Sequence, residues 1–138
     1  MKLYLDTNVV IDLLTERIPF YDDIAKIIVL VENGELTLVI SSVSFVTCEY
    51  VISKIKDKNT TIDLLKKFRI VCEVSNVDEI NIDKSLFSNF NDFEDAVQYY
   101  SALNHKCDTI ITRNKKDFKN SEIPVMTPEE FLVSINKK

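Results

Sequence analysis

Two patterns of apolar residues alternate along this chain. Short runs of aliphatic and β-branched residues, typical of buried strands, are followed by longer stretches in which apolar residues recur every three or four positions, as they do in helices. This alternation predicts βα units built around a parallel sheet. The expected strands are residues 2–6, 37–41, 70–74 and 108–112, with a weaker strand near Val125.

The helical stretches carry start and stop signals. The expected helices cover residues 20–33, 43–55, 61–68, 78–87 and 93–103, and a last helix opens with the sequence TPEE. Gly34, the only glycine in the chain, is expected just beyond the end of the first of these helices, because glycine tolerates the left-handed conformation needed there. In the last helix Thr127 is the expected N-cap, and Glu130 is its capping-box partner.

Length and composition narrow the class of protein. With 138 residues, 46% of them hydrophobic and 28% charged, the chain is expected to form one domain over residues 1–138. The cysteines at 48, 72 and 107 are spaced neither as a zinc knuckle nor as a disulfide framework, which favours a reducing cytoplasm. Residues 36–53 contain a single charge, but its central position, at Glu49, argues against a membrane span.

Two acidic residues occupy positions that favour a role in a site. Asp6 ends the first expected strand, and ligands of open α/β sheets bind beyond the carboxyl ends of the strands. Glu49 is the only charged residue between Glu35 and Lys54, in a helix that is apolar on most faces, where an unpaired carboxylate is costly. Each has an ordinary alternative, since Asp6 also suits a helix cap and Glu49 an exposed or Lys-paired position.

Two further segments add acids at the same edge of the sheet. The sequence DFEDAVQYY places Asp92 and Asp95 on one side of the first turn of a helix, and DTIITRNKKDF places Asn114 and Asp117 just beyond strand 108–112. Helix capping explains either pair alone, with Asp92 or Asn114 as the N-cap and the acid three residues later as its partner. The coincidence of all these acids at one edge indicates a shared site.

The chemistry of these side chains favours a divalent ion. Oxygen-only ligands suit Mg²⁺ or Mn²⁺, and such an ion activates water and neutralises phosphate charge, so phosphodiester hydrolysis is the expected reaction. A net charge of −5 at first opposes a nucleic-acid partner, but setting the five acids of the site aside leaves 17 acids against 17 Lys and Arg. The neighbouring Arg113, Lys115 and Lys116 are expected to hold the nucleic-acid backbone, although they equally suit a solvated surface.

Several segments together resemble the PIN-domain family in order and spacing. They are YLDTNVVIDLL, the isolated Glu49, DFEDA, and DTIITRNKKDF followed by IPVMTPEEFL. The resemblance spans nearly the whole chain and is strongest to the small prokaryotic single-domain members, which include the toxins of VapBC-type toxin–antitoxin pairs. It implies a three-layer α/β/α sandwich with a central parallel sheet and Mg²⁺- or Mn²⁺-dependent endoribonuclease activity. It also implies an RNA substrate and, if the chain is a toxin, an antitoxin protein that covers the cleft and a homodimer. No membrane is expected as a partner, because of Glu49 in the apolar run.

The same resemblance implies roles for individual residues. The catalytic and metal-binding residues it implies are Asp6, Glu49, Asp95 and Asp117. The supporting positions it implies are Asn8, Asp92, Thr112 and Asn114, of which the Thr112 hydroxyl and the Asn114 amide would hold the carboxylates or a metal-bound water. Asp12 also occurs in a family-like position and is expected on a helix surface.

Two other functions are compatible with parts of this pattern. A PIN-like module without activity would hold RNA or a protein partner and would not cut it. A receiver-type phosphoryl-transfer domain also gathers Asp side chains around Mg²⁺, but it needs a nucleophilic Asp after a central strand, whereas the central acid here is expected on a helix. The ribonuclease is favoured because all four acids are present.

Overall fold

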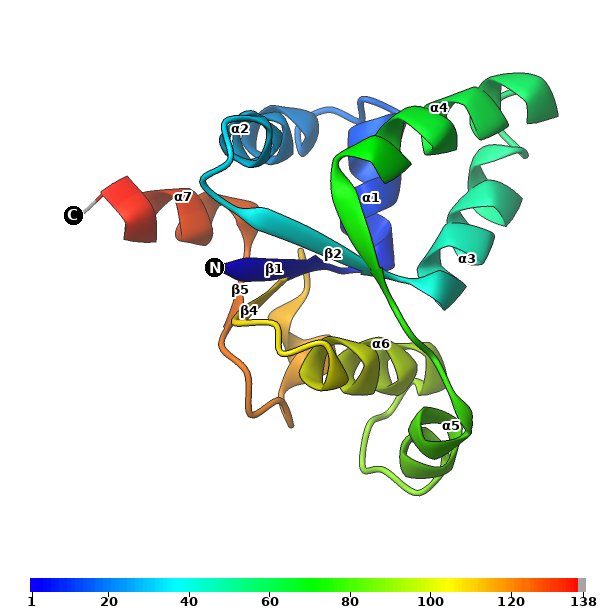
Figure 1. Cartoon of the computed structure of the whole chain (residues 1–138), viewed down its shortest axis with the longest axis vertical. Coiled ribbons are helices and arrows are strands. Elements are labelled where there is room, and N and C mark those ends of the chain that lie inside the picture. The colour runs from blue at the N-terminus through cyan, green and yellow to red at the C-terminus, as the bar shows by residue number, and fades with distance from the viewer. Residues whose placement is uncertain (137–138) are drawn as a thin grey trace.

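The computed structural model describes residues 1–136, and the centre of this region is a sheet of five parallel strands (Figure 1). The strands are β1 (Lys2–Leu5), β2 (Thr37–Ser41), β3 (Cys72–Ser75), β4 (Thr109–Ile111) and β5 (Val125–Met126). Their order across the sheet is β3-β2-β1-β4-β5, so the first strand of the chain is the central one. The predicted parallel sheet and its five strands are confirmed.

Within residues 1–136 the strands are connected by seven α-helices and one short 3-10 helix, η1. They are α1 (Thr7–Leu14), α2 (Tyr21–Glu32), α3 (Ser42–Ile52), α4 (Lys58–Ile70), α5 (Glu79–Leu86), α6 (Phe93–Asn104), η1 (Lys115–Phe118) and α7 (Pro128–Asn136). Figure 1 shows α1 to α4 and α7 on one face of the sheet, and α5 and α6 on the other. The molecule is therefore the three-layer α/β/α sandwich that the resemblance implies.

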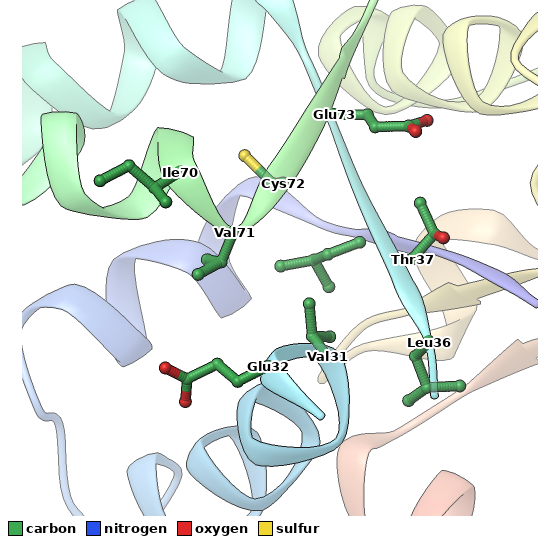
Figure 2. A pocket seen from close by; sticks show the side chains of 9 residues that line it. Val31, Glu32, Leu36, Thr37, Ile70, Val71, Cys72 and Glu73 are labelled. Atoms are coloured by element: carbon green, nitrogen blue, oxygen red, sulfur yellow. The ribbon is translucent and has the colours of Figure 1, made fainter. Parts of the chain in front are cut away.

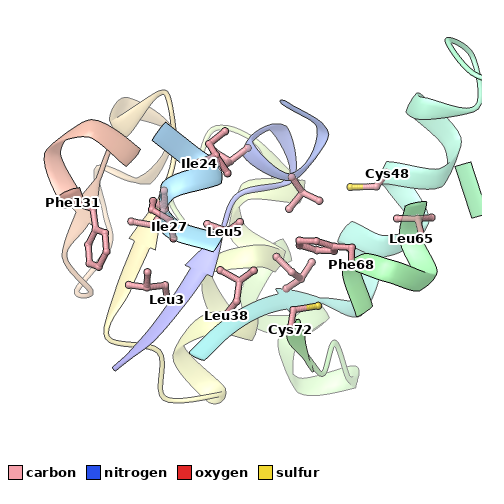
Figure 3. Packing of buried hydrophobic residues seen from close by; sticks show 14 of the residues in the cluster. Leu3, Leu5, Ile24, Ile27, Leu38, Cys48, Leu65, Phe68, Cys72 and Phe131 are labelled. Carbon is pink, nitrogen blue, oxygen red and sulfur yellow. The ribbon is translucent and has the colours of Figure 1, made fainter. Parts of the chain in front are cut away.

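The two faces of β1 divide the hydrophobic core. Because successive strand residues point to opposite faces, Leu3 and Leu5 pack with α2, α4 and α7, while Tyr4 between them packs against α6. Figure 3 shows the larger cluster, in which Phe68 and Phe131 come from helices at its opposite ends. The strands are thus buried on both sides, as expected for a parallel sheet covered by helices.

Capping residues explain where the helices begin and end. Gly34 has a φ of 78°, and the backbone amides of Gly34 and Glu35 donate to the last turn of α2, so the predicted glycine stop is confirmed. The Thr127–Glu130 capping box is also present, with reciprocal bonds of 2.9 and 3.2 Å. Helix α4 begins earlier than predicted because Asp57 caps it, and it runs on to Ile70, so β3 starts two residues later than expected.

The apolar run at residues 36–53 is divided by the fold. Strand β2 takes its first part, Ser41 caps the helix by accepting from the Ser44 backbone amide at 3.1 Å, and α3 takes the rest. In the part of the chain that the structure describes, no helix is both long and apolar enough to cross a membrane.

Candidate active site

Asp6 lies where the central strand ends. The register pairs Leu5 with Ile111, so Asp6 and Thr112, the next residues of β1 and β4, lie side by side at the carboxyl edge of the sheet. The Thr112 hydroxyl donates a hydrogen bond of 2.8 Å to Oδ2 of Asp6. Thr112 therefore occupies the predicted supporting position, with its hydroxyl on the carboxylate.

The second oxygen of Asp6 is held from the opposite helical layer. Nε2 of Gln98, on α6, donates a bond of 2.9 Å to Oδ1 of Asp6. Gln98 is fully buried, and no role was predicted for it. The signal that reveals it is a polar residue three positions after Asp95, which places both side chains on the same side of α6.

Burial and neighbouring acids raise the pKa values of Asp6 and Asp95. Burial raises the pKa of Asp95 to about 7, and the charges of Asp6, Asp92, Asp117 and Glu94 add to the rise. Burial also raises the pKa of Asp6, which Gln98 and Thr112 oppose and Asp117 reinforces. The charges of Asp6, Asp95 and Asp117, which come from three separate segments, thus act on one another at this edge.

Asp117 and Asp92 are held by local bonds. Nδ2 of Asn114 donates to Oδ1 of Asp117 at 3.2 Å, so Asn114 supports a carboxylate as expected. Oδ1 of Asp92 accepts from the backbone amides of Glu94 and Asp95, which confirms Asp92 as the N-cap of α6. A cleft of about 360 Å³ separates these segments, and its lining includes Asp92, Asp95, Asn114, Lys116 and Asp117.

The donor set of this cleft suits a hard cation. Its carboxylates repel one another, and a divalent cation relieves such repulsion while binding through oxygen alone. In residues 1–136 no three His, Cys, Asp or Glu side chains stand close enough to share one ion in this structure. The fit therefore rests on the chemistry and mutual charge of Asp6, Asp95 and Asp117, with Asp92 and Glu94 close by.

Comparison with known proteins decides the family. A family model described as PIN domain matches residues 2–116. The chain belongs to the PIN-domain family. Ribonuclease VapC1 of Aquifex aeolicus (strain VF5) is 30% identical to this PIN domain over 135 residues, which are 94% of this chain and 92% of the relative. The family predicted from the sequence is thus confirmed.

Solved structures share the fold of this PIN domain. A toxin–antitoxin complex from Klebsiella pneumoniae contains a chain with 25% identity and a TM-score of 0.66, covering 91% of this chain and 97% of that one. VapBC2 from Rickettsia felis, bound to a DNA fragment from its promoter, gives 20% identity and a TM-score of 0.63 over 91% and 97% of the two chains. PAE2754 from Pyrobaculum aerophilum, at 16% identity, gives 0.65 over 100% and 91%.

Glu49, the predicted acid of α3, is half-buried, and its Oε2 accepts a bond of 2.6 Å from the Ser53 hydroxyl. Glu94, on α6, also lies near the cluster. Its Oε2 accepts from the Thr47 hydroxyl of α3 at 3.1 Å, and burial, reinforced by Asp6 and Asp92, raises its pKa.

Sequence reasoning overlooked Glu94 because it stands in the first turn of α6, where acids are common for reasons of helix energetics. Its position between Asp92 and Asp95 was the available signal. Asn8, a predicted supporting residue, is exposed on α1 and makes no side-chain hydrogen bond within residues 1–136.

The predicted RNA-binding cations divide into three different environments. Lys116 lines the carboxylate cleft, together with Lys119. Nζ of Lys115 lies 2.9 Å from Oε2 of Glu130, an exposed pair that contributes little to stability. Arg113 is engaged away from the cleft, so Lys116 is the residue of the three whose position suits a phosphate beside the acids.

Arg113 forms an internal ion pair with Asp12, and the expectation that Asp12 lies on a helix surface is wrong. The Asp12 side chain is fully buried, and its Oδ2 lies 2.6 Å from Nε of Arg113. The Arg113 guanidinium also stacks over the Phe20 ring, 4.1 Å from its centroid. Helix α1 packs against α2 and α3, so position 12 is enclosed, and the arginine that follows β4 supplies the compensating charge.

A second hollow, of about 500 Å³, lies at the opposite edge of the sheet (Figure 2). Thr37 and Cys72, the first residues of β2 and β3, line it together with Glu32 and Glu73. Its position at the amino ends of the strands separates it from the acids at the carboxyl ends, so it is not part of the candidate active site.

Proposed function

We propose that this PIN domain is a metal-dependent endoribonuclease that hydrolyses RNA phosphodiester bonds. The observation that supports this most is the gathering of Asp6, Asp95 and Asp117 at the carboxyl edge of the sheet, with the pKa of Asp95 raised to about 7. Acids that repel one another in this way weaken the fold unless a cation is bound, and such sites are typical of function.

The residues of this edge suggest separate roles in binding the metal, holding the carboxylates and binding RNA. Asp6, Asp95 and Asp117 would hold Mg²⁺ or Mn²⁺, and Glu94 or Glu49 would complete the acidic set from α6 or α3. When bound, the ion supplies a water of lowered pKa and neutralises charge on the phosphate. Thr112 and Asn114 keep two of the carboxylates in place through hydrogen bonds of 2.8 and 3.2 Å. Lys116, at the cleft, would bind the RNA backbone as a point charge.

The comparisons support a finer proposal for the biological role. Ribonuclease VapC1 is similar over 94% of this chain, and solved structures of the same fold include toxin–antitoxin complexes. We infer that this chain is the toxin of such a pair, with an antitoxin protein that covers the acidic cleft. The same proposal includes a homodimer, because symmetric dimers are the commonest assemblies of identical chains.

A second candidate is a silent PIN module that binds RNA or protein. The Glu49 carboxylate, which accepts a hydrogen bond from the Ser53 hydroxyl, favours it, because that bond occupies an oxygen that the metal would need. Loss of a complete metal site would leave the fold and its surface cations intact while abolishing cleavage.

Thermal unfolding with and without metal tests the site before any RNA target is known. Three proteins are compared in EDTA and in Mn²⁺: wild type, Asp6→Asn, and the control Asp63→Asn, which changes an exposed acid on α4. Mn²⁺ at 100 times its dissociation constant should stabilise wild type and the control by about 2.7 kcal/mol and leave Asp6→Asn unmoved. Equal stabilisation of all three proteins would place the bound ion elsewhere.

Cleavage of total RNA by the same three proteins then separates the two candidate functions. The nuclease predicts fragments from wild type and Asp63→Asn in Mn²⁺, and none from Asp6→Asn or in EDTA. Intact RNA in every lane, with or without Mn²⁺ binding, would favour the silent module.

A further inference from the structure

Gln98, a residue with no predicted role, holds Asp6 as part of a buried network of hydrogen bonds. It is the only glutamine of the chain, and its side chain is fully buried. While Nε2 donates to Asp6, Oε1 accepts from the Tyr4 hydroxyl and the Thr7 backbone amide at 3.0 Å each, and from the Ser44 hydroxyl at 3.3 Å. One buried carboxamide thus joins α6 to β1, α1 and α3.

The partners of Gln98 permit a single orientation of its carboxamide. The Thr7 backbone amide can only donate a hydrogen bond, so the carboxamide oxygen must face it. An ionised Asp6 can only accept, so the carboxamide nitrogen must face Asp6. Turning the group over would set two donors against each other and two acceptors against each other in a buried site, which is costly. The NH₂ group of Gln98 is therefore aimed at Asp6.

This arrangement controls which lone pairs of Asp6 are left for a ligand. Gln98 occupies one position on Oδ1, and Thr112 occupies one on Oδ2. Because each carboxylate oxygen has two lone-pair positions, these two bonds leave one position on each oxygen unused. Two donors, one on each oxygen, also restrict rotation of the carboxylate about its last bond.

Gln98 also connects the two central acids of the cluster. It stands three residues after Asp95, so both side chains lie on one side of α6. Anchoring Gln98 to Asp6 therefore fixes the rotation and height of α6 relative to β1, and with them the place of Asp95.

We propose that Gln98 is a positioning residue of the nuclease site, which orients Asp6 toward the divalent ion and places Asp95 beside it. The proposal rests on the metal-dependent cleavage proposed above, and it adds a residue that itself contacts neither ion nor RNA. Groups that hold a metal ligand from behind in this way typically change metal affinity 10- to 100-fold when removed.

Gln98→Met tests the proposal, because methionine keeps the length of the side chain and removes its hydrogen bonds. The matched control is Asn81→Leu. Asn81 is a buried amide on α5 that donates to the Val97 carbonyl of α6 at 3.0 Å and accepts from Ser85, without touching Asp6. Both substitutions should lower the melting temperature by several degrees, because each leaves buried polar groups without partners.

The two variants should differ in metal affinity and turnover only if Gln98 has the positioning role. Gln98→Met should raise the Mn²⁺ dissociation constant about 10-fold or more and lower kcat without a matching change in the KM for RNA, whereas Asn81→Leu should keep both at wild-type values. Equal Mn²⁺ affinity in all three proteins overturns the proposal and leaves the nuclease intact. No Mn²⁺ binding by wild type overturns the nuclease, and the proposal with it.

A measurement on the wild-type protein decides the matter where Gln98→Met does not fold. Labelling glutamine with ¹⁵N at the side-chain nitrogen gives one NH₂ pair in the NMR spectrum, which belongs to Gln98 because the chain has no other glutamine. The proposal predicts two resolved protons, one shifted downfield by the bond to Asp6, and a further shift on adding Mg²⁺ that Asp6→Asn abolishes. A pair at the position of free glutamine that ignores Mg²⁺ would overturn it.

Discussion

The buried ion pair between Asp12 and Arg113 gives the sharpest prediction for stability. The Asp12 side chain is fully buried, and the Arg113 side chain is 30% exposed, with 2.6 Å between Oδ2 and Nε. Arg113→Leu removes the only cation shown in contact with Asp12 among the described residues, and also the stacking of the guanidinium on Phe20.

The structure sets the size of the effect. At an effective dielectric constant of about 20, two unit charges 4 Å apart attract by about 4 kcal/mol, and breaking a buried pair typically costs about 3–5 kcal/mol. The stacking on Phe20 contributes about 0.5–1 kcal/mol of this. Arg113→Leu should therefore lower the free energy of unfolding by about 3–5 kcal/mol. Asp12→Leu should cost less, about 1–3 kcal/mol, because the partly exposed Arg113 can turn to water.

Urea unfolding of wild type, both single variants and the double variant Asp12→Leu/Arg113→Leu measures the coupling between the two residues. The double variant should be more stable than Arg113→Leu alone, because no charge is left buried. Lys26→Leu, which changes an exposed cation on α2, is the control and should stay within about 0.5 kcal/mol of wild type. A coupling energy below about 0.5 kcal/mol would refute the reasoning.

The pH dependence of Arg113→Leu provides an independent check. Burial raises the pKa of Asp12, and the charges of Arg113 and Arg17 oppose that rise. Without Arg113 the pKa rises further, so the folded variant holds the proton to a higher pH than the unfolded chain does. As the pH rises from 4 to 7, the free energy of unfolding of the variant should therefore fall relative to that of wild type. A stability difference that is the same at both pH values would contradict this assignment.

Three further changes test other parts of the molecule. Asp95→Asn in EDTA should stabilise the protein by about 1 kcal/mol at pH 8 and leave its stability unchanged at pH 4. The reason is that the pKa of Asp95 is about 7 in the folded state against 3.8 ordinarily, an effect that solvent screening reduces. Equal effects at both pH values would exclude charge repulsion as the cause. Gly34→Ala should cost about 1 kcal/mol in urea unfolding through its φ of 78°, since no atom lies within 4 Å of the added methyl group. Thr127→Ala should cost about 0.5–2 kcal/mol by removing the cap of α7, and an unchanged unfolding midpoint would show that the cap contributes nothing.

Local patterns in the sequence were sufficient for the strands, most helix ends and several site residues. Gly34, Asp92 and Thr127 were predicted in their capping roles because the groups that decide a helix end lie within a few residues of it. Asp6 was predicted at the carboxyl edge of the sheet because it ends a run of strand residues, whereas Thr112 was assigned its supporting position from the family resemblance. The family resemblance then joined these separate positions into one site.

The tertiary structure decided which side chains meet and which charges are buried. Gln98 reaches Asp6 across 92 positions of the chain, and Arg113 reaches Asp12 across 101, so neither contact leaves a local pattern. Glu94 lies near the acids, and its bond to the Thr47 hydroxyl of α3 joins residues 47 positions apart, so it too leaves no local pattern. Periodicity along a chain determines which face of a helix is apolar, but the partner of a buried polar group is determined only when distant segments pack together.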